Sequence, residues 1–383
     1  MITSVEIKNF KSLKEVALET RNLNLLTGLN GSGKSSLIQV FLLLKQSLGL
    51  REGRLDLKGD LFDAGVAEDV YYQFGVEKTI RFGLAYTNPD DEKKLHAIWT
   101  FACDPLTAPA ANVLEAPERY RTIGYLVSEP LSRLNYLTAE RIGPKSSYVK
   151  NVSVVEDKYD PGVGIGGEFS VHFLNRYGNE LKVADPALQH PNAKSELLIH
   201  QTDAWMGEIA PDVQLFTEEI SNEEVRLSFQ FGTNGRGRTN KIKPKNVGFG
   251  LTYVLPVIVA ALTATPGKLI LIENPESHIH PRGQVELGRL LAGCAQSGAQ
   301  LFIETHSDHI LNGLRLAVRE GLIDADKAVA FYFRRSDEDN STDITPIVID
   351  TKGKLHRQTA DGTTAQLPKG FFDQWANSMF ELL

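Results

Sequence analysis

The chain has few cysteines and no long apolar run. Its 383 residues include only two cysteines, Cys103 and Cys294, which lie far apart and lack the spacing of a metal site or a disulfide framework. The longest strongly apolar run, residues 254–262, is too short to span a bilayer, and Pro256 interrupts it. The first residues resemble a strand rather than a signal peptide. We therefore expect a protein of the reducing cytoplasm without a membrane segment.

The chain also lacks an excess of positive charge. Its net charge of −7 argues against a protein coated in nucleic acid, although it leaves room for a local basic groove. Apolar residues make up 42% of the chain, which permits one large α/β domain or two lobes.

The most informative stretch is Gly-Leu-Asn-Gly-Ser-Gly-Lys-Ser at residues 28–35, which fits the phosphate-binding pattern G-x-x-x-x-G-K-[ST]. An apolar strand pattern at residues 23–27 precedes it, and a helix pattern follows at residues 34–48. Backbone N–H groups and the helix N-terminus would face the phosphates, Lys34 would supply a cation, and the Ser35 hydroxyl would ligate Mg²⁺. The alternative is a glycine-rich loop that happens to precede a helix. The predicted cofactor-binding residues are Asn30, Gly31, Ser32, Gly33, Lys34, Ser35 and Ser36.

Two later apolar runs end in polar residues. Residues 269–272 are apolar and are followed by Glu273, as in a buried parallel strand whose acidic end faces a ligand. Glu273 is therefore expected to hold Mg²⁺ directly or through water. Residues 300–304 form a similar run, after which His306 could reach a γ-phosphate or the attacking water and Ser307 could cap a helix. Taken alone, each pattern also fits a purely structural strand end.

The remaining patterns predict an α/β fold of several parts. Residues 79–86 and 95–103 favour paired antiparallel strands, and residues 329–334 and 344–349 favour a hairpin with a long polar turn. The composition shifts between residues 150 and 245, where residues 195–209 predict an amphipathic helix. Asp337, Glu338 and Asp339 lie in the predicted hairpin turn and are interpreted as surface charge rather than as a metal site.

These motifs resemble those of ABC-type ATPases of the SMC/RecF class. The resemblance rests on residues 9–12 (Asn-Phe-Lys-Ser), 28–36, 269–281 and 305–307, and it is closest to small OLD-like and anti-phage defence ATPases. Residues 370–374 (Gly-Phe-Phe-Asp-Gln) resemble the tail of a poorly characterised subgroup. The implied fold is a P-loop ATPase head with a mainly parallel nucleotide-binding sheet, an adjoining antiparallel sheet and an inserted mixed α/β lobe. We assign residues 1–150 and 246–383 to the head and residues 151–245 to the lobe.

The resemblance implies a homodimer in which two ATP molecules are each held between the phosphate loop of one subunit and the signature motif of the other. The matching segment here is residues 246–251 (Asn-Val-Gly-Phe-Gly-Leu), directly before an apolar helix. Gly248 and Gly250 would let backbone N–H groups approach the partner's γ-phosphate. No serine lies between Asn246 and Gly250, so a signature hydroxyl contact is missing. Two glycines in an ordinary helix-entry loop are the alternative.

Asn274 occupies the position where many relatives carry the glutamate that polarises the attacking water. An amide cannot accept that proton. Glu276 is the predicted substitute base, with Glu273 at the metal, His306 near the γ-phosphate and Lys34 as the cation. The prediction is a slow ATPase, and a nucleotide-gated clamp with little hydrolysis is the alternative.

Three further residues have two interpretations each. Phe10 and Lys11 match a corner that the family uses near adenine and ribose, although an aromatic residue in the core explains Phe10 as well. Arg141 either senses nucleotide or a dimer partner, or forms a surface salt bridge.

A basic segment, residues 236–245, precedes the signature segment. It could grip nucleic-acid phosphates, or it could be a solvated hairpin turn. Its cations are Arg236, Arg238, Lys241, Lys243 and Lys245.

Three functions are compatible with these features. The first is a dimeric ATP-dependent switch in bacterial defence that senses foreign or damaged nucleic acid or a phage product and controls a separate effector, a nuclease or a toxin. About 75 residues follow the histidine strand, which leaves little room for an appended nuclease domain. The second is a RecF-like DNA repair clamp. A nucleotide-binding subunit of a transporter is disfavoured, because the signature departs from the transporter form.

Overall fold

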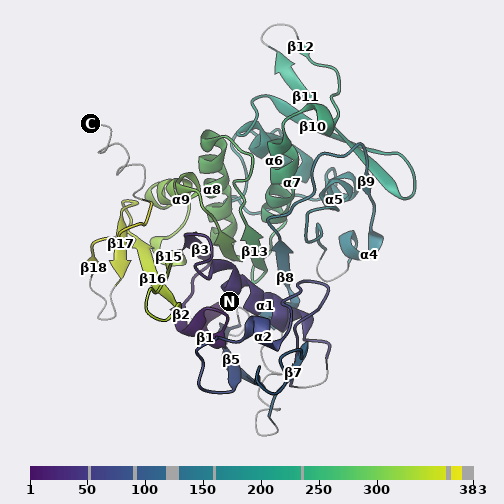
Figure 1. Ribbon diagram of the computed structural model, residues 1–383. Helices are drawn as coiled ribbons and strands as arrows, with labels where there is room; N and C mark the ends of the chain where they lie inside the picture. The colour runs from purple at the N-terminus through teal and green to yellow at the C-terminus, as the bar shows by residue number, and fades with distance from the viewer. Residues whose placement is uncertain are drawn as a thin grey trace. The chain divides into compact units, whose positions relative to one another are not determined.

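The computed structural model describes residues 1–50, 53–88, 93–117, 129–157, 161–233, 237–358 and 364–372 (Figure 1). The chain forms two compact units. Unit 1 contains Met1–Leu134, Ala328–Ile349 and Leu355–Leu383, and unit 2 contains Asn135–Lys327 and Asp350–Lys354. Buried apolar side chains fill each unit.

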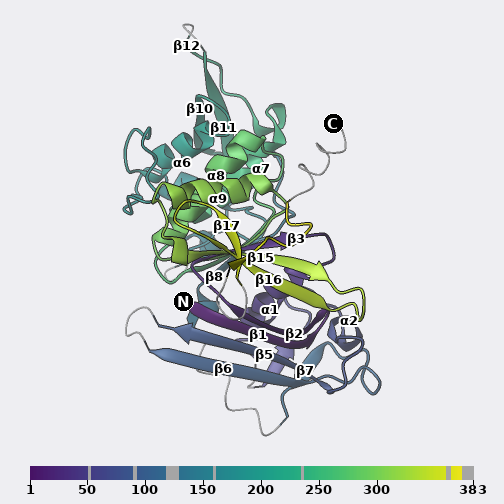
Figure 2. The same ribbon diagram turned by 90° about the vertical axis from the view of Figure 1, so that its left-hand side faces the viewer.

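An antiparallel sheet forms one part of unit 1 (Figure 2). Alternating buried and exposed residues along β2 give it one core-facing side, as expected of an antiparallel strand with one solvated face. The predicted pairing of two strands at residues 79–86 and 95–103 is confirmed by β5 and β6. In spatial order the strands are β2 (Leu13–Glu19), β1 (Ile2–Phe10), β5 (Thr79–Thr87) and β6 (Lys94–Ala102).

The other strands of unit 1 carry the phosphate loop. β3 (Leu23–Gly28) pairs in parallel with β15 (Ala328–Arg335), and α1 (Lys34–Gln46) follows β3 after the loop. The predicted hairpin near the C-terminal end is confirmed, since β15 pairs antiparallel with β16 (Thr342–Ile349). Short elements complete the unit: β4 (Arg54–Asp56), α2 (Ala67–Val70), β7 (Val113–Glu115), α3 (Glu129–Ser132), β17 (Leu355–Gln358) and β18 (Thr364–Ala365).

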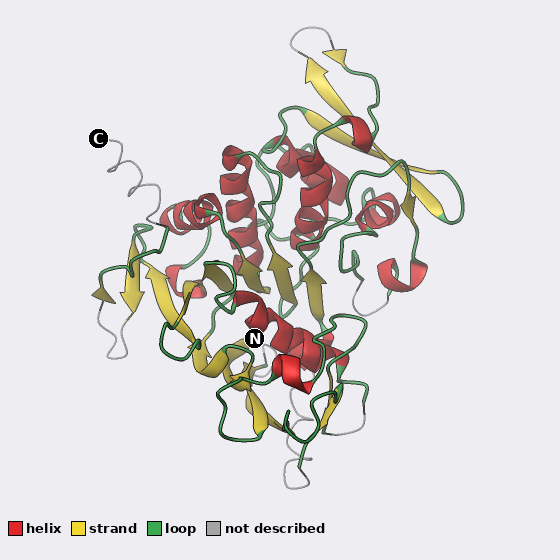
Figure 3. Ribbon diagram, in the orientation of Figure 1, coloured by secondary structure: helices red, strands yellow, loops and turns green. Residues whose placement is uncertain are grey.

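Unit 2 contains a parallel strand pair with helices beside it (Figure 3). β13 (Leu269–Glu273) lies between β14 (Gln300–Glu304) and β8 (Leu134–Leu137), whose residues from Asn135 onward belong to this unit. The first four residues of β13 are buried, which explains the uninterrupted apolar run in the sequence. The helices are α7 (Phe249–Leu262), α8 (Pro281–Gln296) and α9 (Asp308–Arg319), followed by the 3₁₀ helix η4 (Ala325–Lys327).

The rest of unit 2 is a mixed α/β region with a long hairpin. β10 (Val213–Glu219) and β11 (Glu224–Thr233) form the hairpin, and β12 (Gly237–Arg238) pairs with the end of β11. The predicted helix at residues 195–209 is confirmed as α6 (Leu198–Gly207), which is shorter because Leu197 is still extended. The other elements are β9 (Tyr148–Val149), α4 (Val152–Val155), α5 (Ser170–Tyr177) and the 3₁₀ helix η3 (Pro244–Asn246). In the part of the chain that the structure describes, no helix combines the length and the apolar character needed to cross a bilayer.

Candidate functional site

In unit 1, the phosphate loop has the backbone of an anion cradle. Gly28, Gly31 and Gly33 have φ angles of +134°, +73° and +103°, which side-chain-bearing residues rarely adopt. Gly33 is the N-cap of α1, and the first turn contains neither a side-chain cap nor an acidic residue. The N–H groups at this end therefore face no carboxylate of the helix itself, so they are suited to an anionic ligand.

Lys34 lies against this loop and is only 3% exposed. Its ammonium group donates hydrogen bonds to the carbonyl oxygens of Gly28 and Leu29, at 3.0 and 2.9 Å. These bonds hold the cation beside the loop, where it would meet a phosphate. The Ser32 hydroxyl is buried and has no hydrogen-bond partner among the described residues, so a polar group in the loop is left for a ligand. Both observations fit a bound polyphosphate.

Residues distant in sequence support the loop. The Thr342 hydroxyl, at the start of β16, donates to the Ser32 carbonyl at 2.9 Å and lies 2.8 Å from the Ser12 hydroxyl. A Cβ at Gly33 would lie 2.5 Å from the same Thr342 oxygen, so this glycine is required by close packing as well as by its φ angle. Arg335 donates to the Gly31 carbonyl at 2.8 Å. Thr342 and Arg335 were not predicted, because they follow the loop by about 300 residues and belong to no local motif.

The Phe10 ring lies in the core of unit 1. It is fully buried and packs edge to face on Phe82, with ring centroids 5.4 Å apart. This position favours the core role over contact with a nucleotide base. Lys11 donates to Gln39 at 2.8 Å and lies 5.4 Å from the centroid of the Phe62 ring, and burial lowers the pKa of Lys11.

In unit 2, two glutamates end neighbouring parallel strands. Glu273 of β13 and Glu304 of β14 are partners in the strand register, so their side chains point to the same face. A carboxylate oxygen of Glu273 accepts the Ala139 N–H at 3.2 Å, and burial raises the pKa of Glu273. Burial and the nearby Glu273 also raise the pKa of Tyr136. Glu304 was not predicted, although its position at a buried strand end repeats the pattern that identified Glu273.

The segment after β13, residues 274–280, is the acid loop. Asn274 and His278 have positive φ angles of 45° and 63°, which indicates a tightly constrained turn. One carboxylate oxygen of Glu276 accepts the His306 N–H at 2.8 Å. The other oxygen of Glu276 and the side-chain oxygen of Asn274 are buried without a hydrogen-bond partner in the described part of the chain. Glu276 thus contacts the backbone of His306, and its second oxygen is buried with no partner among the described residues.

The structure corrects the predicted surface salt bridge of Arg141, because this side chain is only 3% exposed. Its guanidinium donates to the carbonyl oxygens of Thr138 at 3.1 Å, Tyr253 at 3.0 Å and Glu273 at 2.6 Å, and also to that of Asn274. Burial lowers the pKa of Arg141 to about 10. Arg141 therefore joins the end of β8, the second turn of α7 and the acid loop within unit 2.

The signature segment lies at the start of α7. Gly248 is the N-cap of this helix, and the first turn has no acidic residue. A Cβ at Gly250 would lie 2.3 Å from the His278 carbonyl oxygen, so Gly250 is needed for packing inside the chain. The His278 ring contacts Tyr253 of α7, with centroids 4.8 Å apart. The predicted contact of Gly248 and Gly250 with a partner's nucleotide stays a prediction.

The predicted metal ligands are Ser35 and Glu273, and the predicted N-cap residue is Ser307. Ser35 lies in the first turn of α1, and Glu273 ends β13. Among the described residues, no group of three or more His, Cys, Asp and Glu side chains is arranged to hold a metal ion. A shared Mg²⁺ therefore stays a prediction. Ser307 caps α9 as predicted, since its hydroxyl accepts the N–H groups of His309 and Ile310.

Family models for ATPase domains match most of the chain. One, described as "AAA ATPase domain", matches residues 1–149. A second, described as "AAA domain, putative AbiEii toxin, Type IV TA system", matches residues 158–312. A third, described as "Protein of unknown function (DUF3696)", matches residues 323–382. This range includes the predicted tail at residues 370–374, of which Asp373 and Gln374 lie outside the described residues. A search of curated proteins finds no match.

Solved structures with a similar fold are head domains of Smc proteins. An Smc head bound to the C-terminal winged-helix domain of ScpA is 14% identical, with a TM-score of 0.50, and the match covers 91% of this chain and 98% of that one. The Smc head from Pyrococcus furiosus with an extended coiled coil, bound to the C-terminal domain of ScpA, is 12% identical, with a TM-score of 0.51 and coverage of 91% and 96%.

The family models identify AAA ATPase sequence over residues 1–149 and 158–312, and the likeness to Smc heads shows that the chain has the fold of such an ATPase head. The match over residues 158–312 is to an AAA family whose description names a putative AbiEii toxin of a type IV TA system.

Proposed function

We propose that this protein binds ATP and Mg²⁺, hydrolyses ATP slowly and acts as a homodimeric switch. The observation that carries the proposal is the phosphate loop, with its three positive-φ glycines, the buried Lys34 and an α1 N-terminus without an acid. The three glycines give the loop a backbone that can wrap a phosphate, and the buried Ser32 hydroxyl, which has no hydrogen-bond partner among the described residues, can donate to a phosphate oxygen.

The proposed chemistry assigns one task to each residue. Residues 30–36 bind the phosphates, and Lys34 balances charge on the γ-phosphate as the bond to the leaving group breaks. Glu276 accepts the proton of the attacking water through its unpaired oxygen, and His306 orients the γ-phosphate. Ser35 and Glu273 would hold Mg²⁺, which neutralises phosphate charge when it is bound. Asn274 cannot replace Glu276, because an amide is not a base at neutral pH.

Slow turnover follows from the surroundings of Glu276. Its first oxygen is already engaged by the backbone N–H of His306 and its second oxygen is buried, so the attacking water has little access to this carboxylate. A nucleotide-bound dimer would therefore persist long enough to signal to a separate effector, a nuclease or a toxin. The order of the motifs along the chain supports a sandwich dimer, in which Gly248 and Gly250 approach the partner's γ-phosphate. A defence role rests on the family relation over residues 158–312.

The test compares ATP binding, ATP hydrolysis and sedimentation for the wild type, Lys34→Ala and Glu276→Gln. We expect Lys34→Ala to abolish binding. Glu276→Gln should keep binding, slow hydrolysis about 100-fold and accumulate an ATP-dependent dimer. Glu180→Gln, an exposed glutamate paired with Arg176, is the matched control and should behave as the wild type.

Three results would decide against parts of the proposal. Hydrolysis by Glu276→Gln at the wild-type rate would remove Glu276 from the role of base. Binding without hydrolysis in the wild type would favour the nucleotide-gated scaffold. An unchanged sedimentation coefficient with ATP present would exclude the dimeric switch.

A DNA-binding repair ATPase is the second candidate, and the basic segment before α7 is the observation that favours it. Arg236 lies outside the described residues. Arg238 donates to the Asp212 carbonyl at 3.3 Å, and the Lys241 ammonium lies 4.5 Å from the centroid of the Phe216 ring. Lys243 and Lys245 are exposed. Duplex binding that weakens steeply with salt, and further in a Lys243→Gln/Lys245→Gln variant, would support this function.

A further inference from the structure

Two carbonyl groups of the phosphate loop are held by side chains of the hairpin that β15 and β16 form. The Arg335 guanidinium donates to the Gly31 carbonyl at 2.8 Å, and the Thr342 hydroxyl donates to the Ser32 carbonyl at 2.9 Å. In a trans peptide the C=O and N–H groups point in opposite directions, so a carbonyl held on one side directs the next N–H to the other side. The bond from Thr342 therefore directs the Gly33 N–H away from the hairpin, and this N–H has no acceptor among the described residues.

The carbonyl groups at the start of the loop are held in a similar way. The Lys34 ammonium donates to those of Gly28 and Leu29. The Ser32 N–H makes a long bond of 3.3 Å to the Leu29 carbonyl. A carbonyl oxygen repels a phosphate, whereas a backbone N–H attracts it. These carbonyl oxygens are thus engaged by the chain, while the Gly33 N–H and the Ser32 hydroxyl have no partner in the described part of the chain.

The two hairpin side chains are themselves fixed in place. The Thr342 N–H donates to the Ser12 carbonyl at 2.8 Å, and the two hydroxyl groups of these residues lie 2.8 Å apart. The Arg335 Nε–H donates to the side-chain oxygen of Asn340 at 2.7 Å. Both donors are therefore oriented toward the loop by contacts within unit 1. Such preorganisation reduces the entropy that a ligand has to remove when it binds.

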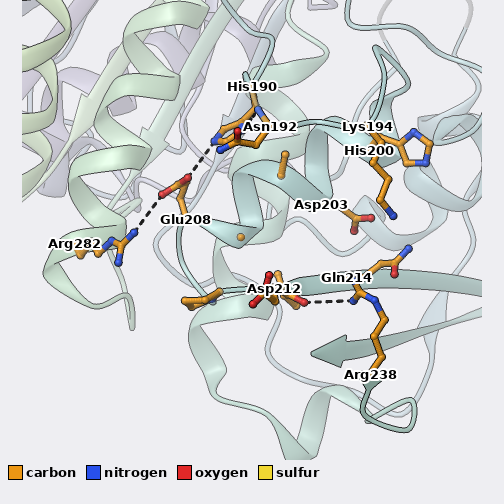
Figure 4. A pocket seen from close by; sticks show the side chains of 14 residues that line it. His190, Asn192, Lys194, His200, Asp203, Glu208, Asp212, Gln214, Arg238 and Arg282 are labelled. Atoms are coloured by element: carbon orange, nitrogen blue, oxygen red, sulfur yellow. Dashed lines mark hydrogen bonds and ion pairs between the residues drawn. The ribbon is translucent and has the colours of Figure 1, made fainter. Parts of the chain in front are cut away.

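The polar pocket of unit 2 differs from this loop, because its charges are balanced (Figure 4). Carboxylates and cations are equal in number among its lining residues, so no net charge favours an anion there. The carboxylates are those of Asp203, Glu208 and Asp212, and the cations are Lys194, Arg238 and Arg282. An anion is better served by the phosphate loop, whose helix α1 has no acidic residue in its first turn.

We propose that Arg335 and Thr342 are positioning residues for ATP, which hold the phosphate loop in its phosphate-binding conformation before the nucleotide arrives. The proposal rests on the function proposed above and extends it to residues outside the ATP motifs. It also gives a task to the segment that matches a family model of unknown function, residues 323–382. A loop that must be ordered by its ligand binds that ligand more weakly, so loss of either donor lowers the affinity for ATP.

The test compares two variants of Thr342 in the full-length protein. Thr342→Val keeps the size of the side chain and removes the hydroxyl, whereas Thr342→Ser keeps the hydroxyl and removes a methyl group. We expect Thr342→Val to weaken ATP binding about five- to tenfold in calorimetry, as the loss of one hydrogen bond predicts, and to raise KM far more than it changes kcat. Thr342→Ser should bind ATP within about twofold of the wild type. A role in packing alone would not separate the two variants in this direction.

Arg335 gives an independent arm with a matched control. Arg335→Met should weaken ATP binding about tenfold, because it removes a charge-assisted bond to the Gly31 carbonyl. Arg334→Met changes the neighbouring arginine of β15, which pairs with Asp343 at 3.5 Å, and should leave the affinity within about twofold. Arg335 is exposed, so its variant keeps the test decisive if Thr342→Val folds poorly.

Three results would overturn the proposal: wild-type affinity in Thr342→Val, equal losses in Thr342→Val and Thr342→Ser, or equal losses in the two arginine variants. Equal losses in the arginine variants would assign the effect to surface charge. A wild type that does not bind ATP would instead refute the proposed function, so the two failures are distinguishable.

Discussion

Replacement of Arg141 by methionine tests whether one buried side chain holds the acid loop in place. Methionine has a similar length and is apolar, so it fills the volume while it removes the charge and every donor. The four carbonyl groups that Arg141 serves would lose these hydrogen bonds in a site that water barely reaches. The change therefore isolates the polar contribution of Arg141 from its packing.

The expected loss in the free energy of unfolding depends on these hydrogen bonds and on the desolvation of the charged group. A buried polar group left without a partner costs about 1–3 kcal/mol, so four groups give an upper bound of about 12 kcal/mol. Two effects lower this bound: the charged guanidinium no longer has to be buried, and the Tyr253 carbonyl, which lies within α7, can keep a helical hydrogen bond. We expect a net loss of about 3–5 kcal/mol, a large part of the stability of an ordinary domain.

Urea denaturation measures this loss, and steady-state kinetics measure its effect on the site. Arg141→Met should lower the urea midpoint at an unchanged slope, whereas Arg141→Lys should lose about half as much. Because Arg141 bonds the backbone of Glu273 and Asn274, kcat for ATP should fall while ATP affinity stays within about twofold. The control Arg226→Met changes a half-exposed arginine whose ion pair with Glu218 is long, and it should shift stability by less than about 0.5 kcal/mol.

Two results would refute this reasoning. Wild-type stability for Arg141→Met would mean that the four bonds contribute nothing net. Lost ATP binding with intact stability would instead assign Arg141 to direct nucleotide contact, which is the other half of the original prediction.

Two more predictions concern single positions in each unit. Gly28→Ala should lower the melting temperature of unit 1 far more than Gly31→Ala, because its Cβ would lie 2.2 Å from the Phe333 carbonyl oxygen, whereas that of Gly31 meets nothing within 4 Å. Equal effects on thermal unfolding would contradict the strain argument. Asp203→Asn should stabilise unit 2 by about 2 kcal/mol above pH 6 and by nothing near pH 4. Burial raises the pKa of Asp203 to about 6 despite the nearby Lys194 and Arg238, so the folded state binds this proton more tightly than the unfolded state, and stability falls as pH rises from about 4 to 6. The measurement is the urea midpoint of both proteins from pH 4 to 7. A constant difference between wild type and Asp203→Asn over this range would refute the prediction.

Local patterns were sufficient for the elements that carry the motifs. The phosphate loop, β13, β14 and the Ser307 cap each depend on a few consecutive residues whose type and spacing reflect their burial. Local pattern also predicted the antiparallel pair β5 and β6, because successive side chains of a strand point to opposite faces and so alternate between apolar and polar types.

Contacts between distant residues could not be predicted in this way. Thr342 supports the phosphate loop from a strand about 300 residues later, and no property of a threonine in a polar turn indicates that task. Arg141 follows a short strand, where exposed arginines are common, and only the fold shows that four carbonyls surround it.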